Sequence, residues 1–302
     1  MPYRIRPNRP LLAEVRSVAR SEFERAIEAL EARPEGLHEA IHAARKRFKR
    51  LRNLYRLVAR RDKTFRRIEN ARLRDAGRHL SIIRDATALI ETVEHLAGHA
   101  VTDDEAETLA ATREVLALRR DEIAAAEADL ETKVSHAIAA CRAAILALDD
   151  LTLPSKPGHA GKLVATGWRK GLEDAREALV TCKGEGHGET YHDLRKAAQA
   201  YWMNLSLLHD LWPSAFDAKQ GYAKKLVDVL GQEHDLTVLT TLLDHEPELF
   251  GNGEGQSFLL AIIIRRQMEL RREALALAEQ VFADPAKDEA GIVETLWLKA
   301  SA

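Results

Sequence analysis

Cysteine, proline, glycine and aromatic residues are all scarce in this chain. Its 302 residues include two cysteines, nine prolines and 16 glycines, and aromatic residues make up 5%. Cys141 and Cys182 are too few for a disulfide framework and show no CxxC spacing. This usage indicates free thiols in a reducing compartment.

Long apolar segments are missing as well. The longest apolar run, Phe258 to Ile264, is about a third of the length that a membrane span requires. The N-terminal segment carries charges throughout, where a signal peptide would need an apolar core. We therefore expect a cytoplasmic protein without a membrane partner.

Neither sign of charge dominates the whole chain, since the formal net charge is −2. The charges are nevertheless sorted along the sequence. The segment from His42 to Asp85 holds 16 Lys and Arg against four Asp and Glu, while the remainder holds 29 basic and 43 acidic residues. Such a local excess of positive charge favours an anionic partner for that segment.

Helix-forming sequence is abundant. Ala, Leu, Arg and Glu dominate, and apolar residues recur at helical spacing nearly everywhere. Thr102-x-x-Glu105 and Ser214-x-x-Asp217 have the form of capping boxes at helix starts. Breaks are expected at Arg33-Pro34 and in segments 149–162, 183–189 and 251–256. These patterns predict an all-α fold of roughly eight helices.

The two halves of the chain resemble each other at an offset of about 150 residues. Three pairs of motifs carry this offset: His42-x-x-Arg45-Lys46 with His192-x-x-Arg195-Lys196, Arg84-Asp85 with His234-Asp235, and, slightly closer, Leu118-Arg119-Arg120 with Ile264-Arg265-Arg266. Because an internal repeat reflects a repeated structural unit, we interpret the chain as two copies of one helical unit.

The segment Leu37 to Val58 carries two stripes of one predicted helix. The apolar stripe, expected in the core, is Leu37, Ile41, Ala44, Phe48, Leu51, Tyr55 and Val58. About 100° further around the helix lies a basic stripe of His38, His42, Arg45, Lys49, Arg52 and Arg56. The part from His42 to Arg56 extends over ~21 Å, enough to face several charges of an extended ligand.

The second copy keeps only the beginning of this basic stripe, because its flank is His192, Arg195, Gln199 and Trp202. A row of charges on a helix is commonly a solvated face. Here, however, like charges repel one another at three-four spacing and few carboxylates relieve them. A bound polyanion explains this arrangement better than solvation alone.

His38-Glu39-Ala40-Ile41-His42 has the H-E-x-x-H form of a helical zinc site. The third ligand that such a site requires has no candidate at the usual spacings, and Arg45, Lys46 and Lys49 would repel a dication. The repeat also preserves His42 as His192 but places Gly188 opposite His38. We therefore predict neither a metal site nor a catalytic one.

Four motifs together resemble the CHAD domain family, the histidine-containing α-helical domains. They are His42-x-x-Arg45-Lys46 with its basic stripe, Arg84-Asp85, Gly167-Trp168-Arg169-Lys170-Gly171, and His192-x-x-Arg195-Lys196. The similarity extends from about Leu11 to Phe282, and the order of the motifs rather than any one of them carries it.

The resemblance implies two pseudo-symmetric four-helix bundles with a basic groove or cavity between them. We place the bundles at residues 8–150 and 160–283, which together form one CHAD domain, and a C-terminal tail at 284–302. The resemblance also implies non-catalytic binding of inorganic polyphosphate, without a cofactor, and association with polyphosphate granules.

Closely spaced phosphate oxygens suit bidentate Arg and point-charged Lys side chains. The predicted polyphosphate-binding residues are His42, Arg45, Lys49, Arg52, Arg56, Arg74, Arg78, Arg119, Arg120, Arg169, Lys170, His192, Arg195, Lys196, Arg265 and Arg266. Lys46, Arg47 and Arg50 lie off the basic stripe and are expected in solvent. Histidines in such a groove should take up protons when a polyanion binds.

Three other functions are open. An accessory to an enzyme of phosphate polymers or nucleotides would want carboxylates that hold a divalent metal, and few occur near the basic segment. Nucleic acid would be attracted through its phosphates, but aromatic residues interleaved with the charges are lacking, so we expect it only as a non-specific competitor. A helical scaffold without a ligand is the last alternative.

Overall fold

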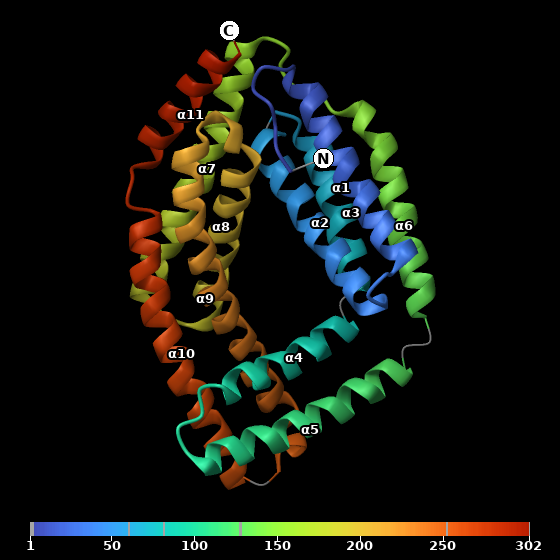
Figure 1. Cartoon of the computed structure of the whole chain (residues 1–302), viewed down its shortest axis with the longest axis vertical. Helices are drawn as coiled ribbons and strands as arrows, with labels where there is room; N and C mark the ends of the chain where they lie inside the picture. The colour runs from blue at the N-terminus through green and yellow to red at the C-terminus, as the bar shows by residue number, and fades with distance from the viewer. Residues whose placement is uncertain (1–2, 60, 81, 127–128, 252, 302) are drawn as a thin grey trace.

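The computed structural model describes residues 3–59, 61–80, 82–126, 129–251 and 253–301, except for the side chains of 82–84. The described chain is helical throughout and contains no strand (Figure 1). The α-helices are α1 (Leu11–Ala32), α2 (Leu37–Val58), α3 (Lys63–His79), α4 (Ile82–Ala97), α5 (Asp103–Ala126), α6 (Leu130–Ala147), α7 (Pro157–Gly184), α8 (Gly188–Leu207), α9 (Pro213–His245), α10 (Gly253–Val281) and α11 (Ala286–Ala300). Short 3-10 turns follow α6, α8 and α9 at Leu148–Asp150, His209–Leu211 and Pro247–Phe250. The all-α prediction is confirmed.

Helices α1, α2, α3 and α6 pack together in one group. The apolar stripe of α2 lies in its core, where Ile41, Phe48, Leu51, Tyr55 and Val58 are buried. Helix α1 ends as predicted, because Arg33 adopts the left-handed conformation before Pro34. Burial of the apolar stripe turns the basic side of α2 away from this core.

The second group consists of α7 to α11, in which α7 contacts α8, α10 and α11, and α9 contacts α8 and α10. The predicted tail at 284–302 contains α11. This helix buries Trp297 against Gly161 of α7, and its Glu289 accepts hydrogen bonds from Trp168 and Tyr201. Residues 286–300 therefore contribute to the core of this group.

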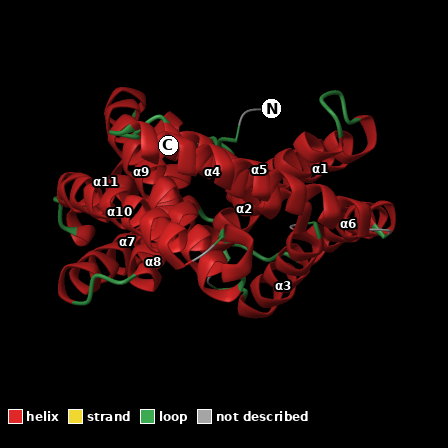
Figure 2. Cartoon of the chain, turned by 90° about the horizontal axis from the view of Figure 1, so that it is seen from below, coloured by secondary structure: helices red, strands yellow, loops and turns green. Residues whose placement is uncertain are grey.

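Helices α4 and α5 leave the first group and lie across the lower end of both (Figures 1 and 2). They pack on each other, and α4 also contacts α9 while α5 contacts α10. Arg119 pairs with Glu246, and Arg265 of α10 pairs with Glu105. These contacts and ion pairs attach the α4–α5 hairpin, which belongs to the first half of the chain, to the second half.

The two groups meet directly where α2 contacts α7 and α8. Asn53 of α2 donates a buried hydrogen bond to Asn204 of α8 (2.8 Å). At Gly167 of α7, a side-chain Cβ would lie 2.1 Å from the Leu57 carbonyl oxygen, so only glycine permits this approach. These contacts lie toward the C-terminal ends of α2 and α8.

Several details of the predicted organisation were wrong. The described chain has eleven α-helices, more than the roughly eight predicted, because some breaks contain neither Pro nor Gly; Asp62 caps α3 by accepting a hydrogen bond from the Phe65 amide. Helices α7 and α10 begin inside the predicted loops 149–162 and 251–256. The repeat itself stays a prediction.

The two capping boxes also differ in outcome. Thr102 and Glu105 cap α5 as predicted, since the Thr102 hydroxyl accepts from the Glu105 amide. At α9 no side chain caps the start, and Asp217 lies 2.9 Å from His209 Nε2 instead.

Candidate functional site

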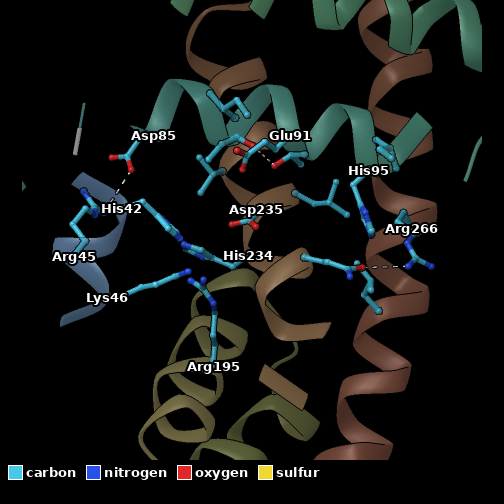
Figure 3. A pocket seen from close by; sticks show the side chains of 18 of the residues that line it. His42, Arg45, Lys46, Asp85, Glu91, His95, Arg195, His234, Asp235 and Arg266 are labelled. Carbon is cyan, nitrogen blue, oxygen red and sulfur yellow. Dashed lines mark hydrogen bonds and ion pairs between the residues drawn. The ribbon is translucent and has the colours of Figure 1, made fainter. Parts of the chain in front are cut away.

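A cavity of about 710 Å³ lies between α2, α4, α8, α9 and α10 (Figure 3). It is called the interhelical cavity below. Its walls are His42, Arg45, Lys46, Lys49, Asp85, Ala88, Leu89, Glu91, Thr92, His95, Leu96, Arg195, Gln232, His234, Asp235, Leu236, Val238, Arg266 and Leu270. Five Lys and Arg face three carboxylates in this set. The volume is typical of ligand sites.

Helix α2 forms the first cationic wall with the N-terminal part of its basic stripe. Arg45 donates a hydrogen bond to the Gly77 carbonyl (3.2 Å) and lies 3.7 Å from Asp85 of α4. Lys46 and Lys49 are exposed, and Figure 3 shows Lys46 pointing toward Arg195 and His234. The two lysines of this wall keep contact with solvent.

The opposite wall comes from α8 and α9 and is more deeply buried. The Nε of Arg195 has no hydrogen-bond partner among the described residues, and no ion pair of Arg195 is present there. Burial lowers the pKa of Arg195, and Asp235 and Glu233 oppose this effect. The guanidinium is therefore partly desolvated, and Asp235 and Glu233 offset its charge without forming an ion pair with it, an arrangement that costs stability.

Two imidazoles stack beside this arginine. The ring centroids of His192 and His234 are 4.5 Å apart, with 24° between the ring planes. Burial, followed by the charge of Arg195, lowers the pKa of His234 to about 4. Burial and the charges of Lys196 and Arg195 also lower the pKa of His192. Both rings are accordingly neutral near pH 7.

Helices α4 and α10 complete the cavity. Arg266 pairs with Glu269 (2.8 Å) and donates weakly to Gln232 (3.4 Å). Asp85 and Glu91 of α4 bring carboxylates to the cavity, and apolar side chains such as Leu89 fill the space between them. The α4 and α10 side of the cavity therefore combines basic, acidic and apolar side chains, whereas the α2 and α8 walls are mainly basic.

A second group of cations follows α2 beyond the cavity. Arg52, Arg56 and Arg74, called the α2–α3 arginine cluster, lie close enough that Arg56 and Arg74 lower the pKa of Arg52 after burial itself. The Nε of Arg52 is buried and has no hydrogen-bond partner in the described chain. Arg74 and the exposed Arg78 share Asp75 at 3.2 and 3.8 Å. The basic stripe thus continues outside the cavity.

The structure brings only some of the predicted binding residues together. His42, Arg45, Lys49, Arg195 and Arg266 line the cavity, and His192 stacks on one of its walls. The remaining residues outside the cavity and the arginine cluster are paired with carboxylates: Arg78 with Asp75, Arg119 with Glu246, Arg120 with Asp121, Arg169 with Glu173, Lys170 with Asp174, Lys196 with Asp193 and Arg265 with Glu105.

Sequence reasoning missed other residues of the cavity. Lys46 was expected in solvent but lines the cavity, since it stands four residues after His42 on the same side of α2. His234 and Asp235 also line it, and their match with Arg84-Asp85 was the signal that could have identified them. Arg47 and Arg50 are not simply solvated, because both pair with the buried Glu22. The side chain of Arg84 lies outside the described residues.

The H-E-x-x-H motif does not form a compact cluster of ligands. His38 is exposed, whereas His42 lines the cavity. Across the described ranges, no three His, Cys, Asp or Glu side chains are grouped as metal ligands. Nor does any helix in these ranges combine the length and apolar character that would cross a membrane.

An all-helical protein with an interhelical cavity, lined by five Lys and Arg and by three carboxylates, is the class that these observations define. A family model, the CHAD domain, matches residues 21–244. This match includes all of α2 to α8 and nearly all of α9, so the chain belongs to the CHAD domain family. Comparison with curated proteins gives no match.

Proposed function

We propose that this protein binds inorganic polyphosphate, without catalysis, in the interhelical cavity. The observation that carries the proposal is Arg195, a half-buried residue whose Nε is buried without a hydrogen-bond partner and which forms no ion pair within the described chain. A partly desolvated charge without an ion pair lowers stability, and a polyanion would reduce that cost when it binds. Membership of the CHAD domain family supports the same ligand class.

The geometry of the walls suits a chain of phosphates. Arg45 and Arg195 offer planar groups for bidentate hydrogen bonds, and Lys46 and Lys49 offer point charges from the facing wall. A flexible polymer with a charge on every unit can contact both walls at once. The carboxylates on α4 leave Arg45 partly neutralised in the empty cavity, so binding requires that its pairing with Asp85 be exchanged for phosphate contacts.

The finer predictions belong to this proposal as well. The two helix groups represent pseudo-symmetric bundles, and the site lies between them. The protein acts in the cytoplasm and associates with polyphosphate granules. Nucleic acid competes for the same charges only non-specifically.

Titration of long-chain polyphosphate into the purified protein at two salt concentrations tests the proposal. Lys49→Ala/Arg195→Ala removes one charge from each wall and should weaken binding at least ~100-fold, because a hydrogen bond to a charged group contributes about 1.5–3 kcal/mol. Arg142→Ala/Lys224→Ala is the matched control, since it removes two charges that pair with Glu31 and Asp228 away from the cavity.

Equal losses in both double variants would show that attraction is general rather than located in the cavity. No binding by the unmodified chain would reject the polyphosphate function outright. A stronger interaction with single-stranded nucleic acid than with polyphosphate at ~0.15 M salt would favour the nucleic-acid alternative.

A further inference from the structure

The stacked histidines His192 and His234 combine three features that the proposed binding does not itself require. Their rings are 4.5 Å apart. His234 faces the cavity, and Figure 3 shows it beside Arg195 and Lys46. The Nδ1 atom of His192 is buried and has no hydrogen-bond partner in the part of the chain described. The pair therefore offers sites for protons next to the anion-binding wall.

Charged residues lie close to this pair or line the same cavity on every helix that forms it. The cationic neighbours are Arg195 and Lys196 of α8, Lys46 and Lys49 of α2, and Arg266 of α10, with the titratable His42 of α2 and His95 of α4 in the same cavity. The carboxylates are Glu189 and Asp193 of α8, Glu233 and Asp235 of α9, and Asp85 and Glu91 of α4.

The cations prevail in the empty cavity. Several of these carboxylates are already engaged elsewhere: Glu233 with Arg271, Asp193 with Lys196, and Asp85 with Arg45. The net effect of burial and neighbouring charge is that both rings of the pair are uncharged at neutral pH. Two imidazolium rings in van der Waals contact would also repel each other.

We propose that His192 and His234 form a proton-accepting pair that takes up protons when a phosphate polymer fills the cavity. The inference rests on the proposed function and extends it to a property of particular residues. Phosphate oxygens reverse the sign of the potential at the rings, so the charged form of each imidazole becomes favourable. His234 is thereby assigned to the binding site together with His192.

The sign of the pH dependence follows from this arrangement. Binding raises the pKa of the pair, so the bound state gains stability below the raised pKa and loses it as pH rises through that value. The affinity should therefore depend on pH over the range from about pH 8 down toward about pH 4, which is the pKa of His234 in the empty protein. Affinity should increase by about three- to tenfold per pH unit between about pH 8 and 6, since full uptake of one proton gives tenfold.

Isothermal titration calorimetry of long-chain polyphosphate in two buffers of different ionisation enthalpy measures the uptake directly. At about pH 6.5 we expect roughly one proton per binding site. His192→Gln/His234→Gln keeps polar side chains of similar length and should abolish the uptake while weakening binding. His136→Gln is the matched control, because it changes the same residue type at an exposed position of α6 outside the cavity. Protonation of the ligand itself is common to all variants and cancels in the comparison.

The single variant His234→Gln and thermal unfolding of each protein show whether the double variant retains its fold. Retained uptake in both the single and double variants, or its loss in His136→Gln, would overturn the assignment to the pair. Binding without proton uptake in the unmodified chain would reject the pair as a proton acceptor and leave polyphosphate binding intact. Absence of binding would reject both.

Discussion

The two cationic walls of the cavity differ in how they hold their charge. On α2, Lys46 and Lys49 stay exposed, and Arg45 has Asp85 and a backbone carbonyl for partners. On α8, Arg195 is half-buried, forms no ion pair in the described chain and lies beside neutral histidines. Charges on the α2 wall therefore cost little in the empty protein, whereas the α8 wall is costly. The costlier wall is the better indication of a ligand.

Replacement of Arg195 by Met should show the largest difference between the two walls in their effects on stability and binding. Arg195→Met exchanges a partly desolvated charge that forms no ion pair for an apolar side chain of similar length, so thermal stability of the empty protein should rise by about 2–4 °C per kcal/mol gained. Polyphosphate affinity should fall by about 10- to 100-fold. Differential scanning calorimetry and a polyphosphate titration measure the two effects.

Lys49→Met is the matched control on the α2 wall. It should weaken binding without an increase in stability, because Lys49 is exposed and its charge is not desolvated in the empty protein. A loss of stability in Arg195→Met would instead show that the guanidinium has a structural role, and the contrast between the walls would disappear.

The α2 wall was the part of the site that sequence could predict. Its apolar stripe fixes which side of the helix is buried, and the basic stripe must then face outward. The α8 wall gave a weaker signal because only His192 and Arg195 continue the pattern. Burial of Arg195 depends on packing with other helices, which local spacing does not report.

The remaining walls depend on tertiary contacts between distant segments. The Thr102 cap predicted where α5 begins, but nothing in the local sequence places the α4–α5 hairpin across α9 and α10. That placement brings Asp85 and Glu91 into the cavity. It also explains why Arg119 and Arg265, which the sequence predicted to bind the ligand, instead pair with carboxylates across the hairpin contacts.

A smaller effect is expected at the α2–α3 arginine cluster, and it would define where the α2 wall ends. Arg52 does not line the cavity, but it lies only three residues, or ~4.5 Å of helix rise, beyond Lys49. Arg52→Ala should lower the affinity for long-chain polyphosphate by about three- to tenfold, because only a longer polymer extends to this cluster while still occupying the cavity. The affinity for tripolyphosphate should change by less than about twofold.

Competition titrations with the two chain lengths, with Arg142→Ala as the remote single-charge control, measure this difference. An equal loss for both ligands would place Arg52 inside the functional cavity. No loss for either would restrict the α2 wall to its N-terminal half.

The smallest effect is expected on α7, although its Gly-Trp-Arg-Lys-Gly motif helped to identify the family. Arg169 and Lys170 pair with Glu173 and Asp174 one turn further along the same helix, outside the cavity. Exposed pairs of this kind are screened at ~0.15 M salt, so Arg169→Ala/Lys170→Ala should change polyphosphate affinity by less than about twofold. Gly167 in the same motif has a different role, because its missing side chain lets α7 approach the Leu57 carbonyl of α2. Gly167→Ala should therefore lower the thermal unfolding midpoint. A loss of affinity in Arg169→Ala/Lys170→Ala as large as that in Arg195→Met would show that the ligand reaches α7, and the site would then have a third cationic wall.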